Sequence, residues 1–152
     1  MQRALVVLDE SEEHRALLRE AGELAAGVGA ELVLLTTLTP DEYAEDAAKI
    51  DQIAQVEHTG YDDDTVVDAV RRFARELAEE EISDLDVEYS VVGEVVDEDE
   101  HADAILETAE NEGCDHVFIT GRRRSPTGKA IFGDAAQRVI LNFDGSVTVR
   151  TS

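Results

Sequence analysis

Four of the thirteen basic residues in this 152-residue chain lie in one short segment, GRRRSPTGKAIFG, at residues 121–133. They are Arg122, Arg123, Arg124 and Lys129, and the segment contains no acid. Guanidinium groups bind phosphate or carboxylate oxygens in a bidentate manner, and glycines before a helix let backbone N–H groups approach an anion. A solvated basic patch is the plainer interpretation. We favour an anion-binding loop because of where the segment falls in the expected sheet.

The pair Gly128-Lys129 invites comparison with a P-loop, but the match fails. The motif G-x-x-x-x-G-K-[ST] needs a glycine and a hydroxyl where this chain has Arg123 and Ala130. We therefore reject magnesium-dependent hydrolysis of the P-loop kind.

Asp9 directly follows the first apolar run of the chain and is a second candidate. It can contact a ribose or a base, or it can cap the next helix together with Ser11. The sequence favours neither role.

Other candidates for chemistry have less support. The acidic stretches at 62–64 and 97–100 lack the glycine and distal Glu of a calcium loop. His101, Cys114 and His116 are a remote possibility as metal ligands, because their spacing matches no known site. Cys114 is expected to be a small buried hydrophobe in a reducing compartment. No nucleophile elbow or carboxylate pair is recognisable, so we predict neither catalytic residues nor a metal.

The chain is strongly acidic. It has 36 acids and 13 basic residues, a formal net charge of −23, and only two of the basic residues are Lys. Such an excess destabilises a compact domain through self-repulsion, which molar salt screens to a Debye length of about 3 Å. We therefore favour adaptation to a salt-rich cytoplasm, resembling proteins of extreme halophiles, over an ordinary acidic protein.

The same composition restricts partners and location. A net negative charge argues against broad nucleic-acid binding. No apolar run approaches the roughly 20 residues of a membrane helix, and the N-terminus does not resemble a secretory signal. We expect a cytoplasmic protein without membrane insertion.

The elements that must position the candidate residues alternate between strand and helix. Continuous or alternating apolar runs predict strands at Ala4–Leu8, Glu31–Leu38, Asp86–Val92, His116–Thr120 and Ser146–Arg150.

Helical periodicity fills the intervals between these strands. The expected buried faces are Leu17, Ala21, Leu24 and Val28 in one helix, Val66, Val70, Phe73 and Leu77 in a second, Ala102, Ile105, Leu106 and Ala109 in a third, and Ala135, Val139 and Ile140 in the last. Ser11 and Asp64 are expected N-caps, and Gly29 is expected to end the first helix. Thr39 opens a capping box with proline at the first helical position, and that helix should run to about Glu57.

Strand character predicts the order of the sheet. Strands one, two and four are continuous apolar runs typical of the centre of a parallel sheet, whereas strands three and five alternate and belong at the edges. This favours 3-2-1-4-5 over 2-1-3-4-5. We predict one α/β domain over residues 1–152, with an open parallel five-stranded sheet, helices on both faces and a Rossmann-like architecture. Winding reverses between strands one and four, so ligands should bind where the loops from Asp9 and Gly121 leave them.

The chain resembles the universal stress protein family over nearly its whole length. The resemblance rests on the opening strand ending in Asp9, residues 26–38, VVGE at Val91–Glu94, NEGCDHVFITGRRR at Asn111–Arg124, the Gly133 turn and the closing SVTVR strand. It implies the same strand order, in a fold like that of the adenine nucleotide alpha hydrolases. It also implies a homodimer formed through the last strand, where alternating Val147 and Val149 suggest an exposed edge that seeks a partner.

Nucleotide-binding members of that family carry G-x2-G-x9-G-[ST] after the fourth strand. Gly121 matches the first glycine, but Arg124 stands at the second. Gly133 matches the third only if one residue is missing, and the hydroxyl position is then Asp134. As an N-cap of the last helix, Asp134 could occupy the N–H donors that otherwise hold phosphate.

The resemblance therefore implies an adenine nucleotide such as ATP, ADP or AMP, bound with altered contacts. Asp9 and Thr37 would line the base and ribose side, and Thr120, Gly121, Arg122 and Gly133 the phosphate side. The loop cations would compensate the charge of Asp134. With them, the full set of predicted nucleotide-binding residues is Asp9, Thr37, Thr120, Gly121, Arg122, Arg123, Arg124, Gly128, Lys129, Gly133 and Asp134.

The leading hypothesis is a regulatory, stress-response dimer that binds this nucleotide without robust turnover. The alternative is an interaction module that has lost nucleotide binding and docks to a protein partner such as a transporter. A weak phosphohydrolase is a third hypothesis.

Overall fold

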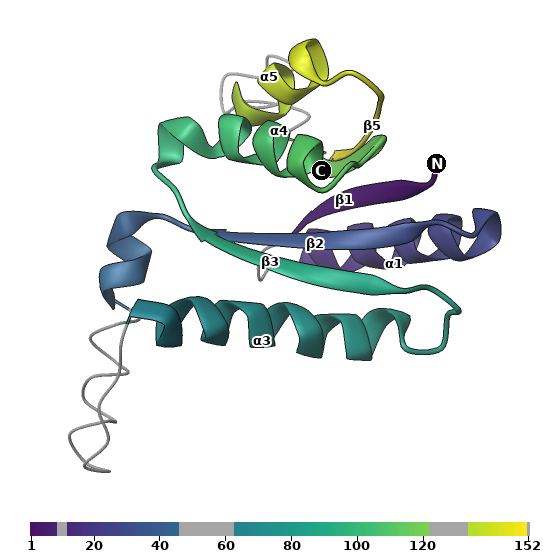
Figure 1. Cartoon of the computed structure of the whole chain (residues 1–152), viewed down its shortest axis with the longest axis horizontal. Helices are drawn as coiled ribbons and strands as arrows, with labels where there is room; N and C mark the ends of the chain where they lie inside the picture. The colour runs from purple at the N-terminus through teal and green to yellow at the C-terminus, as the bar shows by residue number, and fades with distance from the viewer. Residues whose placement is uncertain (9–11, 46–62, 122–133, 152) are drawn as a thin grey trace.

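The computed structural model describes residues 1–8, 12–45, 63–121 and 134–151, and its strands form one parallel sheet in the order β3-β2-β1-β4-β5 (Figure 1). The strands are β1 (Arg3–Leu8), β2 (Glu31–Leu38), β3 (Tyr89–Val95), β4 (His116–Gly121) and β5 (Ser146–Thr151). The predicted order is confirmed. Its physical basis holds as well, because β1, β2 and β4 each contain a continuous run of buried residues, whereas β3 and β5 contain no such run.

Helices cover both faces of the sheet. α1 (Glu12–Val28) and α3 (Asp63–Ile82) lie against one face, and α4 (His101–Asn111) and α5 (Asp134–Asn142) lie against the other (Figure 1). A helical segment also covers residues 40–45, and a 3-10 turn precedes α4. Within the described residues no helix is both long enough and apolar enough to cross a bilayer.

The core divides into two layers because successive strand residues point to opposite faces. Val6, Leu34 and Phe118 belong to the layer under α1 and α3. Leu5, Val33, Leu35, Val117 and Ile119 belong to the layer under α4 and α5.

The helix ends follow the sequence signals in part. Gly29 has φ 76°, a left-handed conformation that suits glycine, and it ends α1 as predicted. Thr39 Oγ1 accepts a hydrogen bond of 3.2 Å from the backbone N–H of Glu42, which confirms the cap at that position. The N-cap predicted at Asp64 is wrong, because α3 begins one residue earlier at Asp63. Ser11 and the stretch from 46 to 57 lie outside the described residues.

The buried face of α1 differs from the predicted one. Leu24 and Val28 are 47% and 61% exposed. The residues that face inward are His14, Leu17, Leu18, Ala21, Gly22 and Ala25. α3 is the cause: it packs so closely on this side that a Cβ atom at Gly22 would lie 2.6 Å from Ile82 Cγ2. Similarly, Ile140 of α5 is 40% exposed although it was expected to be buried.

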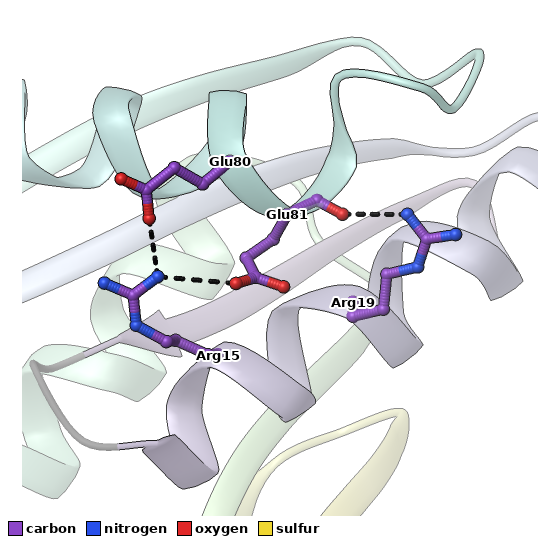
Figure 2. A network of polar contacts seen from close by, with 4 residues as sticks. All are labelled: Arg15, Arg19, Glu80 and Glu81. Atoms are coloured by element: carbon purple, nitrogen blue, oxygen red, sulfur yellow. Dashed lines mark hydrogen bonds and ion pairs between the residues drawn. The ribbon is translucent and has the colours of Figure 1, made fainter.

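Two arginines of α1 form ion pairs and a hydrogen bond with α3 (Figure 2). Arg15 Nη1 lies 2.6 Å from Glu80 Oε2 and 3.4 Å from Glu81 Oε1. Arg19 donates a 2.9 Å hydrogen bond to the backbone carbonyl of Glu81 and also contacts Glu23 and Asp84. These contacts join α1 to α3 through partly exposed side chains.

The third strand lies further along the chain than predicted. It was expected at Asp86–Val92, but β3 runs over Tyr89–Val95 because its register with β2 starts at Leu32↔Tyr89 and ends at Leu38↔Val95. The prediction rested on the alternation of residues 86–92, which does not encode the pairing with β2. In the structure Gly93 lies inside the strand, where α3 passes so closely that a Cβ would meet Arg71 Cγ at 3.3 Å.

Candidate functional site

The candidate site lies at the carboxyl edge of the sheet, where winding reverses between β1 and β4. β1 ends here with Leu8, β2 with Thr36 to Leu38, and β4 with Thr120 and Gly121. Of the predicted site residues, the structure describes the backbone and surroundings of Thr37, Thr120 and Gly121. Both threonines carry hydroxyl groups at this edge, and each hydroxyl contacts a histidine.

Thr120 is paired with His14 of α1. Thr120 Oγ1 lies 3.1 Å from His14 Nε2, and His14 Nδ1 lies 2.8 Å from the carbonyl oxygen of Val7. His14 is only 7% exposed. It therefore joins α1 to β1 and β4 at the point where the sheet reverses its winding.

Sequence reasoning missed this role of His14, because it tested the histidines only for metal-ligand spacing. A signal was present. His14 begins the apolar stripe continued by Leu17, Leu18 and Ala21, so helical periodicity places it on the buried face of its helix. A buried imidazole at that position needs hydrogen-bond partners, and the strand ends supply them.

Thr37 is paired with His101, the first residue of α4. Its Oγ1 lies 3.3 Å from His101 Nδ1, and both side chains are half-buried. Thr37 follows Leu35 on the α4 face of the sheet, whereas Thr120 follows Phe118 on the α1 face. The structure thus brings the two predicted threonines to one edge but to opposite faces of it.

The remaining predicted residues lie mostly outside the described part of the chain. These are Asp9, Arg122, Arg123, Arg124, Gly128, Lys129 and Gly133. The described part of α5 begins at Asp134, the residue expected at its N-cap. Its side chain is not described.

Three groups with shifted pKa values, Cys114, Asp115 and His116, lie at the opposite, amino edge of the sheet. Burial raises the pKa of the Cys114 thiol to about 11, so the thiol stays neutral and is a poor nucleophile. Burial tends to raise the pKa of Asp115, but hydrogen bonds from the backbone N–H groups of Gln2 and Arg3 outweigh it and lower that pKa. Burial lowers the pKa of His116. The Asp115 carboxylate thus connects the start of the chain to the residue before β4.

The possible metal grouping of His101, Cys114 and His116 is wrong. His101 lies at the carboxyl edge beside Thr37, whereas Cys114 and His116 lie at the amino edge, where His116 Nε2 is 2.8 Å from Thr148 Oγ1. The described residues contain no group of three His, Cys, Asp or Glu side chains able to hold a metal ion.

Comparison with known proteins agrees with this fold. The sequence model of the universal stress protein family matches residues 1–150. No curated protein matches the chain.

Several solved structures share the fold. A universal stress protein from Archaeoglobus fulgidus is 24% identical, with a TM-score of 0.68 and 98% of each chain covered. A universal stress protein from the same organism, in complex with dAMP, is 18% identical, with a TM-score of 0.62, 98% of this chain and 97% of that chain covered. A universal stress protein in complex with cAMP is 18% identical, with a TM-score of 0.62, 99% of this chain and 96% of that chain covered.

Proposed function

The chain belongs to the universal stress protein family, and from this we propose that it binds an adenine nucleotide at the carboxyl edge between β1 and β4. One observation carries the proposal. Thr37 at the end of β2 and Thr120 at the end of β4 both carry hydroxyl groups at the edge of the sheet where winding reverses. Structures of similar proteins hold dAMP and cAMP, which supports a nucleotide as the ligand class.

In this proposal Asp9 and Thr37 line the base and ribose. Thr120, Gly121 and Arg122 line the phosphates together with Gly133. Three further cations of the loop, at 123, 124 and 129, offset the charge of Asp134 and of the phosphate. The ligand would be ATP, ADP or AMP, and no resident metal is proposed.

We propose a regulatory role for the nucleotide complex rather than turnover, in a cytoplasmic homodimer adapted to high salt. β5 supports the dimer, because it ends the sheet and leaves one side of its backbone without a strand partner in the described chain. Its Val147 and Val149 side chains are half-buried against the chain's own core, less exposed than the sequence suggested. Pairing through the β5 backbone would extend the sheet without displacing them. Light scattering in molar KCl should give twice the mass of one chain, and a monomer would refute the dimer.

Two measurements test the nucleotide proposal. Protein purified in molar KCl is denatured and the released small molecules are identified by mass spectrometry. Calorimetric titrations with ATP, ADP and AMP then give affinities. If no nucleotide is released and no titration shows binding, the proposal is wrong.

The variant Arg122→Ala tests the phosphate side. It should weaken AMP binding by about tenfold, the effect of one lost charge-assisted hydrogen bond. Arg75→Ala is the matched control, because it removes the same group from an exposed position on α3. Equal effects of the two changes would assign the loss to net charge instead of contact. Phosphate release that disappears on substituting Arg122 or Asp9 would instead indicate a phosphohydrolase.

The second candidate function is a protein-docking module without nucleotide. The altered motif favours it, since Arg124 and Asp134 stand where the family's glycine and hydroxyl are expected. The absence of nucleotide binding together with a stable complex with a protein partner would support this second function.

A further inference from the structure

We propose that His14 is a positioning residue that decides whether the Thr120 hydroxyl can donate a hydrogen bond at the carboxyl edge, so that binding of a phosphate there is coupled to protonation of His14. This inference rests on the proposed nucleotide site and specifies how its phosphate side is regulated. It uses only the described contacts among α1, β1 and β4.

The first step is the tautomer of His14. A carbonyl oxygen can only accept, so the 2.8 Å contact between Val7 O and Nδ1 requires a proton on Nδ1. A neutral imidazole carries one ring proton, and Nε2 is then an acceptor. Both contacts orient the ring of His14, which is only 7% exposed.

The second step concerns Thr120. While His14 is neutral, the 3.1 Å contact with Nε2 is made by the hydroxyl proton of Thr120, and that hydroxyl offers only lone pairs to a ligand. When His14 is protonated, Nε2–H donates to Thr120 Oγ1 instead. The hydroxyl proton can then rotate toward the carboxyl edge and donate to a phosphate oxygen.

The third step follows from linkage. Protonation turns Thr120 into a donor for an anion and also adds a positive charge beside it, so the protonated form binds phosphate more tightly. By reciprocity, phosphate binding favours uptake of a proton by His14.

The described elements around His14 also carry charged side chains. β1 and β4 face His14 with the Val7 carbonyl and the Thr120 hydroxyl. Among these charged side chains are Glu12, Glu13, Arg15 and Glu20 on α1, Glu80 and Glu81 on α3, and Arg150 on β5. All of them are retained when His14 alone is replaced, so a comparison with such a variant isolates its contribution.

The test measures AMP affinity by calorimetry at about pH 5.5 and about pH 8 for the wild type and for His14→Gln. Glutamine offers an N–H to Val7 and a carbonyl to Thr120, as neutral histidine does, but does not titrate. The AMP phosphate itself titrates near pH 6, and the comparison of the two proteins cancels this contribution. The wild type should gain about tenfold more affinity than the variant on going to the lower pH. Adenosine, which lacks the phosphate, should show no such difference.

Paired threonine variants locate the effect. Thr120→Val removes the hydroxyl and should remove the extra gain at low pH, whereas Thr120→Ser should retain it. Thr148→Val is the matched control, because Thr148 forms the corresponding contact with His116 at the opposite edge of the sheet. It should leave the coupling intact.

The outcomes separate the two proposals. AMP binding with the same pH dependence in the wild type and in His14→Gln overturns the coupling but leaves the nucleotide site standing. No AMP binding by the wild type at either pH overturns the nucleotide site, and the coupling with it. A readout on the unmodified protein remains if the variants fail to fold. The nitrogen chemical shifts of the His14 ring at high pH must show the proton on Nδ1, and a proton on Nε2 would refute the inference.

Discussion

Replacing Gly22 by alanine tests the packing that sets the position of α1 and therefore of His14. A Cβ at this position would lie 2.6 Å from Ile82 Cγ2 and 3.1 Å from Leu85 Cδ1. Ile82 Cγ2 is a branch methyl on a stiff helical side chain, so the contact cannot be relieved by moving a flexible end. Overpacking of this kind costs about 1–3 kcal/mol, while glycine to alanine in a helix interior gains up to about 1 kcal/mol.

Gly27→Ala is the matched control in the same helix, because nothing lies within 4 Å of its new Cβ. The helix-propensity gain is similar in the two variants, so their difference reports the steric cost. We expect Gly22→Ala to be less stable than Gly27→Ala by about 1–3 kcal/mol, measured by chemical denaturation in molar KCl.

Ile82→Ala removes the clashing methyl and provides the second half of a double-mutant cycle. Gly22→Ala should cost less in that background than in the wild type. If Gly22→Ala is as stable as Gly27→Ala, or if the cycle shows no coupling, α1 and α3 are not packed as described. The reasoning about the buried face of α1 then fails.

Three further predictions concern other parts of the chain. Gly29→Ala should lower the free energy of unfolding by about 1 kcal/mol. The cost comes from backbone conformation alone, because φ is 76° and no atom lies within 4 Å of the added Cβ. An unchanged denaturation curve would contradict this. The lowered pKa of Asp115 means that its stabilising contribution is present above its ordinary pKa of about 3.9 and is lost as the pH falls through the lower folded value. The stability gap between the wild type and Asp115→Asn should therefore shrink in acid, and a constant gap would refute it. With its pKa raised to about 11, folded Cys114 should react with iodoacetamide at about pH 8 far more slowly than the same thiol in denatured protein, and equal rates would show that it is accessible and activated.

The order of the sheet was predictable because a strand buried on both faces has apolar residues at successive positions. Leu5, Val7, Val33 and Leu35 occupy positions that would be polar in a half-exposed strand, and this alone separates central from edge strands. The ends of β3 were less predictable. Residue pairing with β2 decides where β3 begins and ends, and no local pattern encodes that register.

Strand order predicted which strand ends share the carboxyl edge, but not the side-chain contacts made there. Strand order fixes the edge at which Thr37 and Thr120 lie. The histidines that contact them come from α1 and α4, and only the packing of those helices brings His14 and His101 to the strand ends. Helical periodicity could identify His14 as buried, but not which hydroxyl it would meet. The face of α1 was misjudged for a similar reason, since the tight contact at Gly22 depends on Ile82, sixty residues later.

The two layers of the core are completed at different times during synthesis of the chain. Both helices of one layer, α1 and α3, precede β3, so the first 95 residues include everything needed to cover one face of β1 and β2. The other face of the same strands is covered by α4 and α5, which a ribosome makes last. A nascent chain that has reached β3 therefore exposes Leu5, Val7, Val33 and Leu35 together. This apolar, aggregation-prone surface persists until α4 emerges.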